Sequence, residues 1–226
     1  MLSWADPAVV LRDTHWAALE HARGRADDVV TPLLHLTDDD PDARTSALEV
    51  LELVNHQNSI YSTTVPVALY VAGILGDPRT LPVISTYPTW RGESGCLRVI
   101  LLDFLGGLAD GVCDEELVAA AKHGYRLEDD PAVIAVLAAR PAMFASVSRY
   151  LGDVDTQIRH SAVVAAGYLL DAPELLDYRP ALLAPLRDVA VTSRDISQRA
   201  RAERILLTWN EGPPVVIDSE MDAPPF

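Results

Sequence analysis

"HLTDDDPDARTSAL" (residues 35–48) is the segment that decides the fold, because acids and a proline stand directly before a run of small and apolar residues. Asp40 suits the N-cap of a helix beginning at Pro41, where a proline loses no helical hydrogen bond. Three more acids lie near the positive end of this helix dipole: Asp38, Asp39 and Asp42. Apolar residues then recur at helical spacing over 43–54, and residues 29–36 predict a shorter helix before the acids. The unit is helix, acidic turn, helix.

The same unit recurs at two later places in the chain. "YLGDVDTQIRHSAV" (150–163) aligns without gaps on residues 35–48, and "TSRDISQRARAERIL" (192–206) supplies a third copy. In each copy an arginine follows the capping aspartate by one helical turn; the pairs are Asp40 and Arg44, Asp155 and Arg159, and Asp195 and Arg199. We expect each arginine to reach the acidic turn of an adjacent repeat. A spacing of about 40 residues is typical of stacked helical hairpins.

Aspartates and Asp-Pro pairs that can begin helices recur along the whole chain, so the repeat interpretation extends beyond the three copies. Candidate capping aspartates are Asp6, Asp40, Asp77, Asp114, Asp155 and Asp195, and Asp-Pro occurs at 6–7, 40–41, 77–78 and 130–131. We therefore predict an all-α, right-handed solenoid of about five to six hairpins over residues 1–210, with no sheet. "STYPTWRGESG" (85–95) predicts a loop, and the acidic, proline-rich tail 211–226 is expected to be extended or disordered.

The repeated pattern resembles HEAT repeats, whose second helices begin with D-x-x-x-R-x-x-A. More narrowly, the first half is similar to actinobacterial HEAT-repeat proteins of the HEAT-like, PBS-lyase HEAT type. The segments that carry this similarity are "WAALEHARGRADDVVTPLLHL", "DDDPDARTSALEVL" and "NHQNSIYSTTVPVALYVAGIL". It covers roughly residues 14–75 well and the remainder only through the repeat pattern. The resemblance implies a helical-repeat fold and assigns no chemistry.

Charge narrows the classes of partner. The formal net charge is -15, and Lys122 is the only lysine. Phosphate and anionic membrane surfaces need a dense cationic face, so nucleic acid is an unfavourable partner and membrane binding is not expected. An acidic surface suits a basic protein partner instead. The sequence does not indicate an oligomeric state.

The cellular compartment is predicted from the absence of targeting, membrane-spanning and disulfide patterns in the sequence. "MLSWADPAVVLRD" has no cationic segment followed by an apolar one, and no apolar run approaches the ~18 residues that span a bilayer. Cys96 and Cys113 do not make a disulfide framework. We predict a cytoplasmic protein with reduced thiols.

The sequence contains no recognisable catalytic, cofactor or metal site. "GESGC" (92–96) lacks the G-x-S-x-G spacing and the preceding strand of a nucleophile elbow. The histidines are scattered and form no metal-ligand spacing. No cofactor is expected.

The polar stretch "NHQNSIYSTT" (55–64) is the most unusual segment. It forms either a structural hydrogen-bond network, the favoured interpretation, or a binding loop. The candidate partner-binding residues are His56, Gln57 and Tyr61 from this stretch, with Trp16, His21 and Trp90 at the same end of the solenoid, and Asp38 and Asp39 in the acidic turn.

Four arginines in the last helical segment lie at steps of seven, seven and three, which places them on one helix face: Arg187, Arg194, Arg201 and Arg204. Acids dilute this face, so an ion-paired surface is favoured over a nucleic-acid stripe. The function that we predict is a non-enzymatic protein-binding scaffold, in a narrower form an immunity or antitoxin-like inhibitor of a basic partner. The alternative is an enzyme: a DNA glycosylase-like, nucleic-acid-processing HEAT protein, or a HEAT-like bilin lyase.

Overall fold

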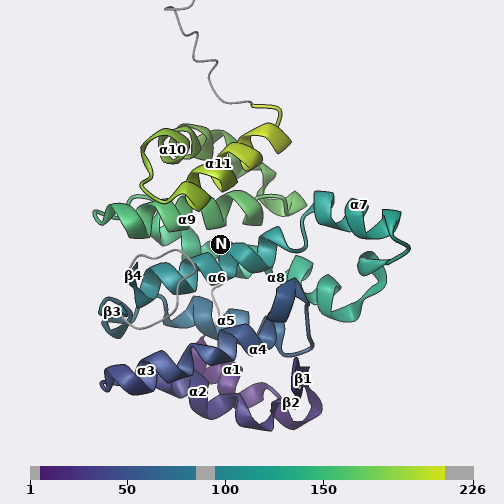
Figure 1. The fold of residues 1–226 in the computed structure, drawn as a ribbon, viewed down its shortest axis with the longest axis vertical. Helices are drawn as coiled ribbons and strands as arrows, with labels where there is room; N and C mark the ends of the chain where they lie inside the picture. The colour runs from purple at the N-terminus through teal and green to yellow at the C-terminus, as the bar shows by residue number, and fades with distance from the viewer. Residues whose placement is uncertain (1–5, 85–94, 212–226) are drawn as a thin grey trace, which may run out of the picture.

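The computed structural model describes residues 6–84 and 95–211, and this part of the chain is mainly helical. Helices stack in layers along the long axis, with α1–α3 at one end and α10 and α11 at the other (Figure 1). The α-helices are α1 Pro7–Asp13, α2 Val30–His35, α3 Pro41–Ala47, α4 Glu49–Val54, α5 Thr64–Ile74, α6 Leu97–Asp110, α7 Asp114–Lys122, α8 Pro131–Val147, α9 Thr156–Leu169, α10 Arg179–Thr192 and α11 Ile196–Thr208. The 3-10 turns are η1 Trp16–Ala18, η2 Ala26–Asp28, η3 His56–Asn58, η4 Pro78–Thr80, η5 Leu127–Asp129, η6 Ser148–Tyr150 and η7 Pro173–Tyr178. The all-helical prediction is confirmed at this level.

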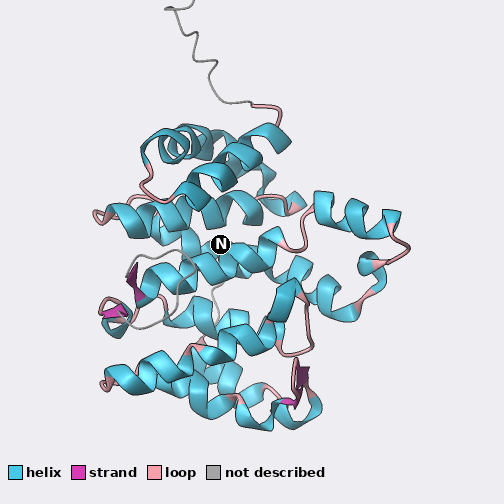
Figure 2. Ribbon diagram, viewed as in Figure 1, coloured by secondary structure: helices cyan, strands magenta, loops and turns pink. Residues whose placement is uncertain are grey.

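The expectation of no sheet was wrong in one detail. Two short antiparallel ladders occur, β1 Glu20–His21 with β2 Gly24–Arg25, and β3 Val83–Ile84 with β4 Gly95–Cys96 (Figure 2). Each pairs two residues on each side, so neither forms a layer that helices pack on. Gly24 has a φ of 121°, a conformation that residues with a Cβ rarely adopt, and it closes the first ladder. The sequence does not alternate apolar and polar residues in these segments, because such short ladders bury no sheet face.

The centre of the stack is the contact between α6 and α9. Every residue from His160 to Leu169 is buried, so α9 has neighbours on all sides. On α6 the leucines at 97, 101, 105 and 108 are fully buried. Helix α5 packs on α8, and α10 packs on α11. The core therefore runs through the layers from one end to the other.

Aspartate caps begin five of the eleven described α-helices and the 3-10 turn η4. The residues whose carboxylates accept a hydrogen bond from the backbone N–H two positions later are Asp6, Asp40, Asp77, Asp130, Asp155 and Asp195. The prediction for Asp114 was wrong, since it is the first residue of α7 and Cys113 occupies the N-cap. Asp130, the capping residue of the fourth Asp-Pro pair, caps α8 instead.

The repeated arginines close their own turns, which corrects the expectation of contacts to an adjacent repeat. Arg44 Nη1 donates to the Asp38 carbonyl at 2.6 Å, and Arg159 Nη1 donates to the Asp153 carbonyl at 2.6 Å. Arg199 Nη1 donates to the Ser193 carbonyl at 2.5 Å. In all three copies the acceptor lies six residues earlier, because a guanidinium one turn into the helix reaches back past the cap. The contact is local and therefore repeats with the sequence.

Arg44→Ala is expected to lower the free energy of unfolding by about 1–3 kcal/mol, because the variant leaves turn carbonyls without a charged donor. Arg159→Ala, in the second copy, is expected to have a similar effect. Arg12→Ala is the control, since Arg12 is exposed and its guanidinium pairs with the adjacent Asp13. Its change should stay within about 0.5 kcal/mol. Urea denaturation measures all three, and losses equal to that of the control would show that the turns do not need the arginines.

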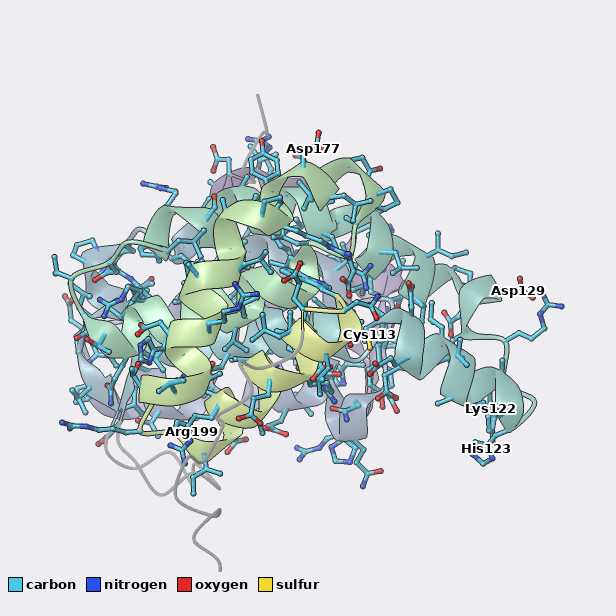
Figure 3. The ribbon with its side chains drawn as sticks, turned by 90° about the horizontal axis from the view of Figure 1, so that it is seen from above. Cys113, Lys122, His123, Asp129, Asp177 and Arg199 are labelled. Carbon is cyan, nitrogen blue, oxygen red and sulfur yellow. The ribbon has the colours of Figure 1, made fainter. Side chains whose placement is uncertain are left out.

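Helix α7 projects from the side of the stack (Figures 1 and 3). None of its residues is buried, and its C-terminal end carries Lys122, the only lysine of the chain. In Figure 3 Lys122 and His123 lie at the tip, far from Asp177 of η7. The only ammonium side chain is thus remote from the layered core.

One apolar helix is longer than the sequence analysis expected. Pro131–Tyr150, which joins α8 and η6, spans 20 residues with a mean hydropathy of 1.5, enough by length and composition alone to cross a membrane. It contacts α5, α6 and α9, as a core helix does. It also contains Arg140, which is 3% exposed. The statement that no apolar run reaches this length was wrong. Residues 212–226 of the predicted tail and most of the predicted loop 85–95 lie outside the described residues.

Candidate functional site: an acidic groove along helix α6

Two hollows meet on the half-buried side of α6, and together we call them the α6 groove. The first, the His160 hollow, has a volume of about 660 Å³ and lies between α6, α9, the end of α10 and the start of α11. The second, the Arg204 hollow, has a volume of about 680 Å³ and lies between α4, η3, α6 and α11. Ile100 and Asp103 of α6 line both hollows. Residues far apart in the sequence therefore share one continuous surface.

Carboxylates outnumber guanidinium groups along the described lining of the groove. The acids are Glu52, Asp103, Asp110, Glu116, Asp155, Asp188 and Asp195. The arginines are Arg159, Arg194, Arg201 and Arg204. A groove with low-dielectric walls and an excess of one sign of charge concentrates its field, and here the sign is negative.

The two arginines of the Arg204 hollow are occupied by contacts within the chain. Arg204 Nη2 donates to the Tyr168 hydroxyl at 2.6 Å and to a carboxylate oxygen of Asp110. Arg201 Nη2 lies 3.8 Å from the other Asp110 oxygen. Both guanidinium carbons lie over the Tyr168 ring, at 5.2 Å for Arg201 and 5.3 Å for Arg204. This cation–π and ion-pair cluster joins α6, α9 and α11.

Tyr168 stays protonated inside that cluster. Burial raises the pKa of its hydroxyl, and the negative charge of Asp110 raises it further, while the two arginines lower it less. A neutral phenol can accept the hydrogen bond from Arg204 without carrying charge. The cluster is a structural junction whose carboxylate already balances part of the positive charge.

The predicted arginine stripe does not form on one helix. Arg187 belongs to α10 and pairs with Glu211 at 2.8 Å, whereas Arg194 lies in the connection after α10. The chain reverses between Ser193 and Asp195, so Arg201 and Arg204 lie on a different, neighbouring helix. The spacing of seven residues was read across a turn, where helical periodicity does not apply.

The His160 hollow contains a buried imidazole. His160 is 4% exposed, and its Nε2 lies 3.8 Å from a carboxylate oxygen of Asp188. Burial lowers the pKa of His160; the Asp188 charge opposes this shift and does not reverse it. The imidazole is consequently neutral at pH 7.

The sequence left two interpretations of the polar stretch 55–64 open, and its two halves fit different ones. Its second half is a structural network: Thr64 Oγ1 donates to the Val54 carbonyl at 2.6 Å, and Thr63 Oγ1 donates to the Glu20 carbonyl. Ser62 Oγ accepts from the Glu20 backbone N–H at 2.8 Å. The bonds to Glu20 join the segment to β1, and the Thr64 bond joins it to the end of α4.

The first half of this stretch lies at the groove. Asn55, Gln57 and Asn58 line the Arg204 hollow, and Gln57 and Asn58 have φ values of 52° and 61°. Such positive φ values hold these side chains in an exposed 3-10 turn. Of the predicted binding residues, Gln57 therefore borders the groove, while exposed His56 lies in the same turn.

Three other predicted binding residues lie in different surroundings. Trp16 is buried, and its Nε1 donates to the Leu11 carbonyl at 3.1 Å. His21 is buried and its Nε2 lies 2.9 Å from Asp28. Tyr61 is half-buried beside Thr64, and Trp90 lies outside the described residues. The structure does not gather this set into one rim.

The predicted turn acids also lie apart from the groove lining. Asp38 Oδ1 accepts from the Asp40 backbone N–H at 2.9 Å, so it shapes the α2–α3 turn. Asp39 is exposed in the same turn. The sequence analysis missed Asp103 and Asp110, although they interrupt the apolar helix α6 seven residues apart and therefore on one face.

The thiols carry no sign of activation. Cys96 is half-buried, Cys113 is buried and both are free. Burial raises the pKa of each thiol, so neither favours the thiolate that nucleophilic chemistry needs. Within residues 6–84 and 95–211, no three histidine, cysteine or acidic side chains gather in a way that could hold a metal ion. The described lining of the groove presents an excess of carboxylates.

Comparison with known proteins gives no relative to guide the assignment. No protein-family model matches the chain, and neither a curated protein nor a solved structure matches it.

Proposed function

We propose that this chain is a helical-repeat scaffold whose α6 groove binds a basic segment of a partner protein. The observation that carries the proposal is the excess of carboxylates along a continuous groove, where Arg204 is bonded to Asp110 and Tyr168 and Arg201 lies beside both. A cationic segment meets more carboxylates than guanidinium groups there, and charge complementarity speeds association. The narrower form is an inhibitor of the immunity type, which covers a basic active site.

The repeat architecture supports the same proposal. The three aligned copies share the aspartate cap and the arginine that closes its own turn, as a HEAT-like right-handed solenoid would. Solenoids build extended binding surfaces from successive repeats, and the α6 groove draws on α4, α6, α9, α10 and α11. A nucleic-acid-processing enzyme has less support, since the arginines that such a role needs are split between helices. The cytoplasmic location stays a prediction.

The proposal predicts that an oligoarginine peptide binds the protein and that removing groove charge weakens binding. Glu52→Gln combined with Glu116→Gln removes two carboxylates from the Arg204 hollow and is expected to weaken binding roughly threefold to tenfold. Fluorescence anisotropy of a labelled peptide at low and high salt measures the change. Binding by the parent should weaken as salt rises, because exposed charges are screened.

A charge-matched control removes two acids from another face. Glu174→Gln combined with Asp177→Asn changes η7, which contributes no residue to the lining of either hollow. The control is expected to bind within about twofold of the parent, since exposed charges beyond the Debye length are screened. Equal weakening in both double variants would mean that net charge, not the groove, holds the peptide. No binding by the parent would refute the function itself.

A further inference from the structure

An unsatisfied polar atom lies inside the His160 hollow. The His160 side chain is 5% exposed, and among the described residues its Nε2 has no hydrogen-bond partner. Asp188 Oδ2, at 3.8 Å, is beyond hydrogen-bond length. Buried polar side-chain atoms nearly always have a partner, and those that do not call for an explanation. Here the buried imidazole lines an open hollow beside the exposed carboxylate of Asp188.

The pair His160 and Asp188 is suited to a cationic donor. A carboxylate accepts hydrogen bonds, and a neutral imidazole accepts one at the nitrogen that carries no proton, which is Nε2 in the tautomer with its proton on Nδ1. Two acceptors 3.8 Å apart can share one ammonium or guanidinium group whose nitrogens lie ~2.9 Å from each. The Asp188 side chain is 55% exposed, so it faces both the imidazole and the solvent from which the ligand arrives.

The surroundings of this pair oppose an anion. The charged groups facing His160 across the hollow are Asp103 from α6, Asp155 and Arg159 from α9, Asp188 from α10, and Arg194 and Asp195 from the connection into α11. Acids exceed arginines in this set, and Arg159 is already bonded to the Asp153 carbonyl. Val99 and Ile100 line the same hollow and offer apolar surface to the methylene stem of a long side chain.

We propose that His160 and Asp188 form a receptor for one lysine or arginine side chain of the basic partner, which inserts into the His160 hollow. The inference rests on the proposed function and deepens it, because it names the residue type that the groove selects and the atoms that bind it. The cation donates to His160 Nε2 and to the Asp188 carboxylate, and its stem lies along Val99 and Ile100.

The test uses fluorescein-labelled oligolysine and oligoarginine peptides, with fully acetylated oligolysine as the uncharged comparison. Asp188→Asn removes the charge and keeps the shape, and His160→Phe removes the acceptor and keeps a ring. Each is expected to weaken binding roughly tenfold, as the loss of a hydrogen bond to a charged group does. His160→Gln, which keeps an acceptor oxygen, should stay within about threefold. Acetylated oligolysine should not bind. The two charged peptides then show whether an ammonium or a guanidinium group is preferred.

A pH series supplies a second readout. Protonation turns His160 from an acceptor into a cation, so peptide affinity should fall as pH drops below 6.5 toward its lowered pKa. The carboxylates that face His160 titrate in the parent and in His160→Gln alike, so the difference between the two proteins isolates the imidazole. A matching pH profile in both proteins would contradict the role of His160.

The outcomes separate this inference from the function on which it rests. Asp177→Asn is the single-charge control, because Asp177 lies in η7 and does not line the His160 hollow, and thermal melts confirm that each variant is folded. If His160→Phe does not fold, Asp188→Asn alone decides, because its carboxylate is half-exposed. One outcome would refute the receptor and keep the proposed scaffold function. In it, the Glu52→Gln, Glu116→Gln double variant binds peptide more weakly than the parent, and Asp188→Asn binds as the parent does. A parent protein that binds no basic peptide would overturn both.

Discussion

Gly106→Ala is expected to lower the free energy of unfolding by about 3 kcal/mol, through overpacking at the centre of the fold. A Cβ built on Gly106 would lie 2.9 Å from the Ala165 Cα and 3.0 Å from its Cβ. Ala165 belongs to α9, and its Cα cannot rotate away as the end of a flexible side chain can. The two helices must therefore separate, and the α6–α9 contact is the most extensive in the described stack.

The neighbouring glycine provides a matched control, whose substitution is expected to change the free energy of unfolding in the opposite direction. A Cβ built on Gly107 meets nothing within 4 Å. Gly107→Ala is expected to raise the free energy of unfolding by about 0.5–1 kcal/mol, because alanine loses less backbone freedom in a helix than glycine does. Urea denaturation of the two variants measures the difference. A stabilised Gly106→Ala would show that α6 and α9 are not in backbone contact there.

Arg140→Met is expected to lower the free energy of unfolding by about 2–4 kcal/mol, because it leaves buried carbonyls without a donor. Arg140 is 3% exposed, and its Nη2 donates to the Val112 carbonyl at 2.9 Å and to the Ala109 carbonyl at 3.4 Å. These carbonyls belong to the end of α6 and the turn that follows. Burial lowers the pKa of Arg140, yet its usual value is so high that the guanidinium keeps its charge at pH 7.

Arg126→Met is the control for Arg140→Met, since the Arg126 side chain is 71% exposed and pairs with Asp129 at 2.9 Å. Its effect should stay below about 0.5 kcal/mol. Thermal melts give the stability of both variants, and hydrogen exchange of the amides of the α6–α7 turn locates the damage. If the two variants melt at the same temperature, the buried guanidinium does not hold this turn.

The helical unit was predictable because its interactions are local. An aspartate cap joins a side chain to a backbone N–H two residues later, so the sequence at Asp40, Asp155 and Asp195 contains everything that the cap needs. The arginine contact spans only six residues, but its acceptor was misassigned. Position in the alignment marked Arg44 as a structural residue, whereas the direction of its side chain depends on the turn's conformation.

The sequence by itself determined the caps, the helical units and the excess of negative charge, since each depends on residue type and on neighbours within two turns. Only the tertiary structure decided which acids share a surface. Arg204 and Asp110 meet across 94 residues, and His160 on α9 meets Asp188 on α10. Such contacts depend on how layers of helices stack, and stacking follows from close fits such as Gly106 against Ala165. The α6 groove exists because packing brings together side chains that no local pattern relates.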